Sequence, residues 1–257
     1  MVNPNYAQGG AVGQRSAAID AGLQAHMTKV YALMGGAMVL TGLVAYVFGM
    51  DLNALVRGQE TTLIPAGLLV SLYASPLKWV VMLAPLGIVF FFGAMINRLS
   101  VGTAQMIFWA FGALMGVSIA SIFAVYTGIS IAQTFFATAA GFGALSLWGY
   151  TTQKDLSGWG SFLFMGVIGL LIASLLNMFF FESSAMQWAI SLLGVLIFAG
   201  LTAYDTQNIK NTYLVMRTQP GGEEWLEKGA IMGALSLYIN FLNMFMFLLQ
   251  FMGQSND

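Results

Sequence analysis

The spacing of the charged residues is the feature that most constrains the fold of this chain. Only 7% of its 257 residues are charged, against about 25% in an ordinary soluble domain. The charges are separated by long uncharged runs. An ionisable side chain at the centre of a bilayer is costly, and a spanning helix needs about 20 apolar residues. Each uncharged run of that length therefore predicts one membrane crossing.

The uncharged runs predict an all-α membrane protein with seven transmembrane helices. Five runs have the length of one crossing, and they lie between Lys29 and Asp51, Lys78 and Arg98, Asp155 and Glu182, Glu182 and Asp205, and Lys228 and Asp257. A further run, from Arg98 to Lys154, is long enough for two helices with a turn near residues 126–128. We expect a flexible tail at residues 1–25 and a single helical bundle at residues 26–257.

The positions of lysine and arginine predict the orientation, because cytoplasmic loops collect basic residues. With seven helices and a cytoplasmic N-terminus, only Arg57 and Lys78 of the nine basic residues lie outside. The apolar segment 61–77 is short and contains Pro65 and Pro76. An eighth crossing there would move most basic residues outside. We therefore expect an external interfacial or re-entrant segment at 61–77, and an external C-terminus.

Composition excludes several classes of function. The formal net charge of −1 leaves no basic field for nucleic acid. The chain has no cysteine and a single histidine, His26, so disulfides, clusters of cysteine or histidine around a metal, and a serine hydrolase triad within the membrane are excluded. No glycine-rich phosphate loop occurs, and we expect no cofactor. We expect His26 to be solvated, ahead of the first helix.

Asp205 is the first candidate functional residue, because it ends a long uncharged run. If Lys210 extends to the membrane interface, Asp205 lies about 7 Å deeper along the helix. An acid at that depth tends to face a cavity or a partner. The alternative is a solvated helix end.

The last predicted helix carries a polar stripe. Ser236, Asn240, Asn243 and Gln250 are spaced so that they share one helix face. Asn240 is expected close to the bilayer midplane. The stripe either ties this helix to its neighbours or lines a pathway. In both cases the last helix should be buried in the bundle.

Short motifs along the chain resemble the transmembrane Bax inhibitor motif family, which includes bacterial YccA-like membrane proteins. The motifs occur in order as Lys29-Val30-Tyr31, Ile96-Asn97, Ser130-Ile131, Gly149-Tyr150-Thr151, Lys154-Asp155-Leu156-Ser157, Tyr204-Asp205-Thr206-Gln207 and Asn243-Met244-Phe245. The resemblance implies seven helices with the last one central. In some members it also implies a calcium leak governed by one acid in each of the last two helices. Asp205 matches the first acid, whereas the second position is Asn240, which cannot titrate.

Three functions follow from these residues. The first is a cation leak or sensor for calcium or protons, in which Asp205, Asn240, Asn243, Ser236 and Tyr204 face a pathway and Asp205 is the calcium ligand. The second, implied by the YccA-like relatives, is a non-transporting regulator of a membrane-bound protease of the FtsH type, with the N-terminal tail as a handle. The third is an intramembrane aspartyl protease, suggested by Tyr204-Asp205, but it lacks a second aspartate in the last helix. We expect a bacterial inner-membrane protein that is not an enzyme.

Overall fold

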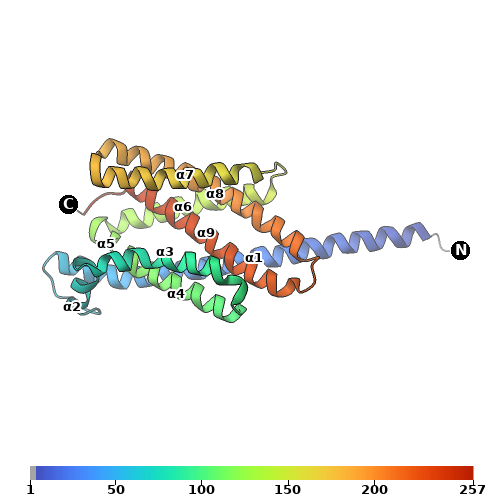
Figure 1. Cartoon of the computed structure of the whole chain (residues 1–257), viewed down its shortest axis with the longest axis horizontal. Helices are drawn as coiled ribbons and strands as arrows, with labels where there is room; N and C mark the ends of the chain where they lie inside the picture. The colour runs from blue at the N-terminus through green and yellow to red at the C-terminus, as the bar shows by residue number, and fades with distance from the viewer. Residues whose placement is uncertain (1–3, 257) are drawn as a thin grey trace.

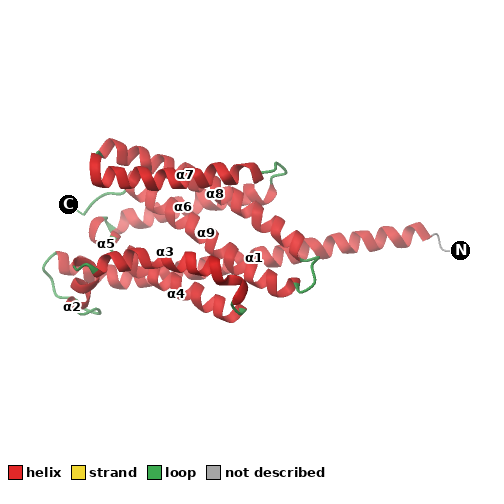
Figure 2. Ribbon diagram, in the orientation of Figure 1, coloured by secondary structure: helices red, strands yellow, loops and turns green. Residues whose placement is uncertain are grey.

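The computed structural model describes residues 4–256, and the side chains from residue 19 onward. Its helices are α1 (Pro4–Val56), α2 (Ala66–Leu69), α3 (Leu77–Met95), α4 (Val101–Ile119), α5 (Ile122–Val125), α6 (Gly128–Thr151), α7 (Ser157–Leu176), α8 (Ser184–Met216) and α9 (Gly222–Met252). Among the described residues there is no strand beyond one isolated bridge between Tyr126 and Ser255. The prediction of an all-α fold is confirmed (Figure 2).

Seven helical segments in the described residues are long and apolar enough to cross a membrane. They are α1, α3, the pair α4 and α5, α6, α7, α8 and α9. The predicted turn near residues 126–128 is confirmed, because α5 ends at Val125 and α6 begins at Gly128. The Thr127 side chain caps α6 by accepting a hydrogen bond from the Ser130 backbone N–H at 3.2 Å. The seven-span prediction is therefore confirmed.

The last helix is central, as expected. In Figure 1, α9 runs obliquely through the middle of the bundle, and it packs against α8, α1, α6 and α4. In its most apolar stretch 61% of the residues are buried, whereas no other span exceeds 33%. Small residues such as Ala230, Gly233 and Ala234 let neighbouring helices approach closely. Central placement also keeps Asn240 buried, at 3% exposure.

The contact between α1 and α4 depends on small residues. Gly112 and Gly116 are buried against α1, and a Cβ atom at Gly116 would lie only 2.7 Å from the Thr41 carbonyl oxygen. Ala120 is fully buried just beyond the end of α4. Ala124 lies on the separate helix α5. The small residues therefore form a smooth face that packs against α1, and this face ends where α4 ends.

A hydrogen-bonded cluster links three helices in the core. The Thr41 hydroxyl of α1 donates to the Gly112 carbonyl of α4 at 2.7 Å and lies 2.7 Å from the Tyr238 hydroxyl of α9. Because Thr41 has one hydroxyl proton, the Tyr238 hydroxyl donates to Thr41. Tyr238 is completely buried. This cluster fixes α9 between α1 and α4.

Segment 61–77 does not form an eighth span among the described residues. It contains the single turn α2 and a π-helical turn at Val70–Ala74. The Tyr73 hydroxyl donates to the Val117 carbonyl near the end of α4 at 2.6 Å, and burial raises the pKa of Tyr73 to about 12. The segment is thus attached to one end of the bundle. Its location outside the cell stays a prediction.

Asp51 holds the start of this segment. Its carboxylate accepts hydrogen bonds at 2.6–2.8 Å from the backbone N–H groups of Thr62, Leu63 and Ile64, and from the Thr62 hydroxyl. Bonds from several backbone donors to an ionised group are among the stronger hydrogen bonds in proteins. One side chain therefore anchors the connection that follows α1.

We predict that Asp51→Asn lowers the melting temperature in detergent and speeds proteolysis within residues 57–76. The asparagine NH₂ group would face backbone donors and could not accept their hydrogen bonds. Asp155→Asn is the matched control, because Asp155 accepts a single backbone hydrogen bond, from Ser157. Equal effects of the two substitutions would contradict the anchoring role of Asp51.

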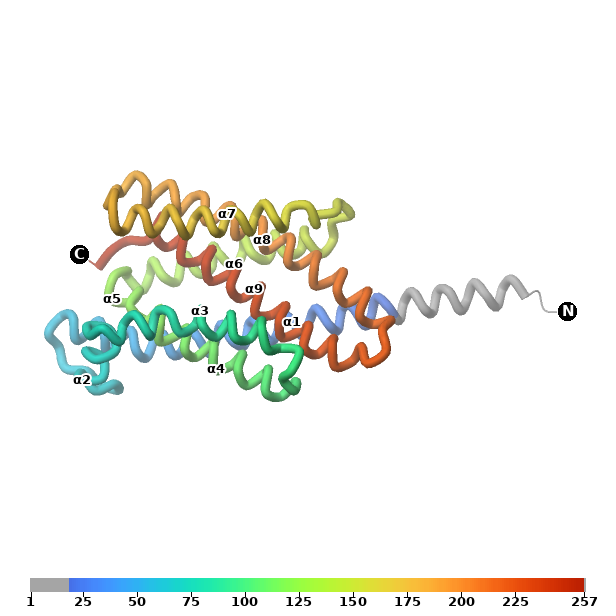
Figure 3. Tube along the Cα trace, viewed as in Figure 1, coloured from blue at the N-terminus to red at the C-terminus, as the bar shows by residue number. Residues whose placement is uncertain are grey.

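The C-terminal residues and the connection between α8 and α9 lie at opposite ends of the bundle (Figure 3). The C-terminal residues bond to the turn between α5 and α6, because Thr127 N–H donates to the Gln254 carbonyl and Asn256 N–H to the Val125 carbonyl. The connection between α8 and α9 lies at the opposite end (Figure 3). The cytoplasmic location of the N-terminus stays a prediction, as does the division into residues 1–25 and 26–257. The backbone of α1 continues across that boundary without a break.

His26 was expected to be solvated ahead of the first helix, and this was wrong. It lies within α1 and is half-buried, with its ring 5.1 Å from that of Tyr213 in α8. The first helix begins well before the first long uncharged run, so the charge pattern alone placed its start too late.

Candidate functional site

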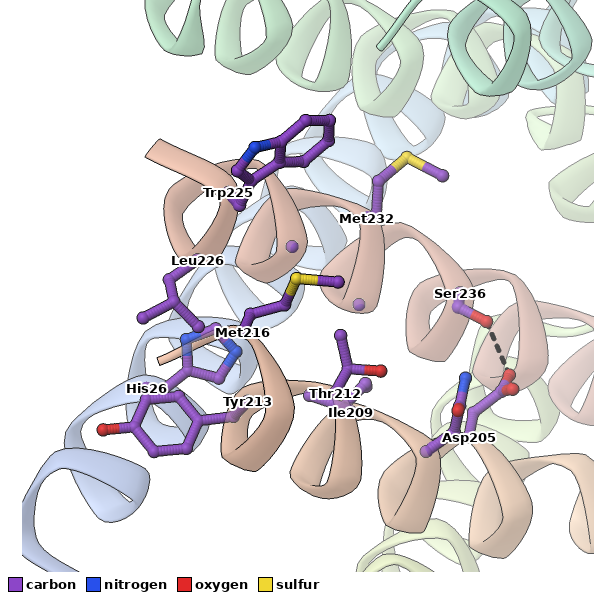
Figure 4. Close-up of a pocket in the computed structure, with 13 residues that line it drawn as sticks. His26, Asp205, Ile209, Thr212, Tyr213, Met216, Trp225, Leu226, Met232 and Ser236 are labelled. Atoms are coloured by element: carbon purple, nitrogen blue, oxygen red, sulfur yellow. Dashed lines mark hydrogen bonds between the residues drawn. The ribbon is translucent and has the colours of Figure 1, made fainter. Parts of the chain in front are cut away.

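A cavity of about 260 Å³ lies between α8 and α9, with α1 at one end. His26 and Tyr213 stand at that end, whereas Asp205 and Ser236 stand at the other (Figure 4). Most of the remaining lining is apolar, and the residues involved are Asn208, Ile209, Thr212, Met216, Trp225, Leu226, Gly229, Met232 and Gly233. The cavity therefore leads from the end of the bundle that carries the α8–α9 connection to an acid within a spanning helix.

Asp205 is held by two donors from the central helix. Ser236 Oγ donates to Asp205 Oδ2 at 2.5 Å, and Asn240 Nδ2 donates to the same oxygen at 2.7 Å. An ionised carboxylate fits this arrangement because it only accepts hydrogen bonds. Asp205 is half-buried. Two of the predicted residues thus position the third across the interface of α8 and α9.

The second oxygen of Asp205 faces the cavity. Among the described side chains, no hydrogen bond reaches Asp205 Oδ1, and no side-chain oxygen is both buried and without a partner. Asp205 Oδ1 is therefore accessible, and Asp205 lines the cavity. A cation that passed along the cavity would reach this carboxylate at its inner end (Figure 4).

No basic side chain neutralises Asp205 within the described part of the chain. The ion pairs found there join Lys29 to Glu227 and Lys228 to Glu224. Lys210 points elsewhere, since its Nζ donates to the Tyr150 carbonyl at 2.9 Å and lies 5.3 Å from the centre of the Tyr150 ring. Asp205 is thus an unpaired acid beside a cavity.

The other two predicted residues do not join this cluster. Asn243 donates to the Ile239 carbonyl of its own helix at 2.8 Å. Tyr204 packs against α7, where a Cβ atom at Gly160 would lie 2.6 Å from the Tyr204 ring. The structure therefore brings together Asp205, Ser236 and Asn240, and places Asn243 and Tyr204 apart from them.

A second polar contact lies farther along the interface of α8 and α9. Gln187 Nε2 donates to Gln250 Oε1 at 2.8 Å, and the Ser191 hydroxyl, which donates to the Gln187 carbonyl at 2.9 Å, lies 3.3 Å from the same Gln250 oxygen. Between this contact and Asp205 stands Phe247, whose ring packs on Gly194 and stacks on Phe198 with centroids 5.9 Å apart. We call this line of residues, from Asp205 to Gln250, the α8–α9 seam. Its two polar contacts are separated by aromatic rings.

Gln207 is a structural residue that the sequence reasoning missed. Its buried amide donates to the Lys154 carbonyl and accepts from the Leu156 N–H, both at 2.8 Å, and so holds the connection between α6 and α7. In that connection, hydrogen bonds from the Ser157 hydroxyl and N–H hold the pKa of Asp155 below its usual value. The sequence did hold a signal for this role, because Gln207 is a polar amide two residues after Asp205 in a chain with few polar residues.

The site lacks the acid pair of an aspartyl protease in the described residues. Asn240 stands opposite Asp205, and Asp155 lies in the connection after α6. No group of three or more acids and histidines that could hold a metal ion occurs there either. A cation at Asp205 would therefore be held by one carboxylate together with neutral oxygens.

Comparison with known proteins agrees with this architecture. A family model described as "Inhibitor of apoptosis-promoting Bax1" matches residues 23–257. A protein of Caulobacter vibrioides is 42% identical over 260 residues, which cover 99% of this chain and 98% of the relative. The inner membrane protein YbhL of Escherichia coli is 42% identical over 233 residues, which cover 91% of this chain and 93% of the relative. A membrane protein of Streptococcus pyogenes is 32% identical over 241 residues, which cover 92% and 96%.

The resemblance inferred from the short motifs is thus confirmed over nearly the whole chain. The family match covers all seven spans and the cluster around Asp205. The chain therefore belongs to the family of inhibitors of apoptosis-promoting Bax1, a family of multi-pass membrane proteins.

Proposed function

We propose that this protein is a cation leak or sensor, with calcium or protons as the responding ions and Asp205 as the site. The observation that carries the proposal is an unpaired carboxylate in a spanning helix, with one oxygen open to a cavity. Intramembrane acids are costly and usually mark ion or proton pathways. The name of the Escherichia coli relative supports placement in the bacterial inner membrane.

The donor set supports transient binding of a hard cation. Calcium prefers six to eight oxygen ligands, and this site offers the Asp205 carboxylate and the Ser236 hydroxyl, while Asn208 and Thr212 line the same cavity. Water in the cavity would complete the shell. Conduction requires binding that is weak enough for release. One carboxylate with neutral partners suits a leak better than a storage site.

We expect the pH response to depend on Asp205 alone, because Asn240 cannot titrate. Protonation of Asp205 would remove the negative charge nearest the path, so cation flux should fall on acidification with a single-site dependence. We predict that Asp205→Asn lowers calcium flux at neutral pH about tenfold, equivalent to roughly 1.4 kcal/mol of lost cation stabilisation. The remaining flux should no longer depend on pH. Purified protein in liposomes with an entrapped calcium indicator provides the measurement.

Two further variants sharpen this experiment. Asn240→Asp should create a coupled pair of acids and move the pH transition upward, because like charges resist joint ionisation. Asn243→Ala is the matched control, because Asn243 bonds only to its own helix among the described residues, and it should keep the wild-type pH profile. An unchanged pH profile in Asp205→Asn would remove the proposed role of Asp205.

A second function is regulation of a membrane-bound protease, with residues 1–25 as the handle. This hypothesis would be favoured if wild-type protein in liposomes showed no calcium flux. Co-purification with a protease of the FtsH type should then be lost on deletion of residues 1–25. A leak through the α8–α9 seam should survive that deletion.

A further inference from the structure

The helices α1 and α6 both pack against α9, and hollow space separates them from each other over much of their length. The Tyr31 hydroxyl of α1 and the Ser146 hydroxyl of α6 are hydrogen-bonded at 2.5 Å and bridge the gap at one level. On either side of this bridge lies an open cavity. We call the two cavities together the α1–α6 groove.

The two parts of the groove differ in polarity. The first, of about 900 Å³, has a mixed lining, in which the polar residues Asp20, Gln24, Thr28 and Tyr150 stand among apolar ones such as Met27 and Leu147. The second, of about 520 Å³, is almost wholly apolar, and its lining includes Met34, Met38, Val39, Leu43, Phe135 and Phe241. Tyr31 and Phe142 line both parts, so the parts adjoin at these residues. The groove therefore passes from polar to apolar along the direction in which α1 crosses the membrane.

The length of the apolar part matches one lipid chain. From Tyr31 to Leu43 the axis of α1 rises about 18 Å at 1.5 Å per residue. One leaflet of a bilayer has a hydrocarbon depth of about 15 Å, half of the usual 30 Å core. The polar part then lies at the level of the lipid headgroups. An amphipathic molecule with one end in each part fits this division.

The walls of the apolar part are smooth. Gly35 and Gly42 of α1 both line it, and a Cβ atom at either position would meet no other atom within 4 Å. Ala139 lines it from α6. The rings of Phe241 and Phe142 meet edge to face, with their centroids 5.4 Å apart, and form the base. A flexible hydrocarbon chain makes good van der Waals contact with such a surface, and no water is needed there.

A negative charge stands at the polar end. Asp20 lines the groove and is exposed, and it is the one charged residue among the described residues that line this part. A headgroup that carries an ammonium would find an opposite charge there. An anionic headgroup without an amine would leave Asp20 opposed by a like charge.

We propose that the α1–α6 groove binds one phospholipid of the phosphatidylethanolamine class, with an acyl chain over Phe241 and the headgroup between Asp20 and Tyr150. This site is separate from the cavity at Asp205 and does not depend on ion flux. The bound lipid would fill the gap between two helices that otherwise meet mainly through α9.

The test is native mass spectrometry of the full chain, released from detergent with added phosphatidylethanolamine or phosphatidylglycerol. Wild-type protein should retain one phosphatidylethanolamine, and phosphatidylglycerol more weakly. The double variant Gly35→Leu, Gly42→Leu places two side chains in the apolar part and should reduce retention at least about tenfold, equivalent to roughly 1.4 kcal/mol. Its fold should persist, because leucine is the better helix former by up to about 1 kcal/mol at each position.

Gly87→Leu is the matched control, because Gly87 is an exposed glycine of α3 where a Cβ atom also meets nothing within 4 Å. It should retain lipid as wild type does. Equal retention by the double variant and the control would overturn the proposal. A dimer in wild type that becomes a monomer in the double variant would show that a second copy occupies the groove and would overturn the proposal. Stronger retention of phosphatidylglycerol would overturn the headgroup assignment.

Discussion

Phe247→Ala is expected to increase cation flux through the α8–α9 seam by at least about tenfold, equivalent to a barrier lower by roughly 1.4 kcal/mol. The Phe247 ring separates the Asp205 cavity from the polar contact between Gln187 and Gln250. Hydrophobic constrictions block ions by excluding water. Because Gly194 offers no side chain beneath the ring, truncation to alanine would leave an opening that water could enter. Calcium influx into liposomes measures the result.

The control for Phe247→Ala must distinguish the loss of a gate from a general destabilisation of the helix bundle. Phe92→Ala removes a ring of equal size from a site that is 1% exposed in α3, away from the seam. Phe92→Ala should destabilise the fold by roughly 3–5 kcal/mol, and Phe247→Ala by less because Phe247 is only partly buried, but only Phe247→Ala should raise flux. Phe247→Leu should stay close to wild type, since a branched apolar side chain still excludes water. Equal leakage through both alanine variants would show that Phe247 is not a gate.

The second large effect is expected at Gly149, where α6 lies directly on α8. A Cβ atom at Gly149 would approach the backbone of Ala203, with its Cα at 2.9 Å and its carbonyl carbon at 3.0 Å. Backbone atoms inside a helix cannot move aside independently, so the two helices would have to separate. We expect Gly149→Leu to lower the free energy of unfolding by about 3 kcal/mol or more, at the upper end of the cost of overpacking. Denaturant unfolding in detergent is the measurement.

Gly141→Leu supplies the comparison on the same helix. A Cβ atom at Gly141 meets nothing within 4 Å, so leucine there should be neutral or slightly stabilising. The contact at Gly149 also supports the hydrogen bonds of Ser146 with Thr206 and Tyr31, at 2.9 and 2.5 Å. If Gly149→Leu were as stable as Gly141→Leu, the close approach of α6 and α8 would be incorrect.

The fold was predictable because charge in a membrane is so costly. The uncharged runs, together with the distribution of lysine and arginine, predicted the seven spans and the turn before Gly128, and the polar residues of the last helix required that it be buried. The same logic identified Asp205 and its partners Ser236 and Asn240. In each case the large free-energy penalty of placing a polar group in lipid reduced the number of possible arrangements.

The direction in which each polar side chain points was harder to predict, because it depends on how each helix is rotated against its neighbours. By its spacing Asn243 lies on the same helix face as Asn240, yet its amide donates a hydrogen bond to the Ile239 carbonyl of its own helix. Tyr204 adjoins Asp205 but turns toward Gly160 of another helix. The position of His26 inside α1 was missed because charges can continue along a helix beyond the membrane. These choices cost little free energy, so no sequence pattern determines them.

The central position of α9 has a consequence for biogenesis. The ribosome releases the last helix only after the other six spans have been synthesised, and segments made first fold first. Those six spans must therefore wait in the lipid with their middle unfilled and with Thr41 and Asp205 lacking the partners that α9 brings. Nascent chains arrested before residue 222 should accordingly be recognised by quality-control proteases, because the native bundle cannot assemble before α9 has been made.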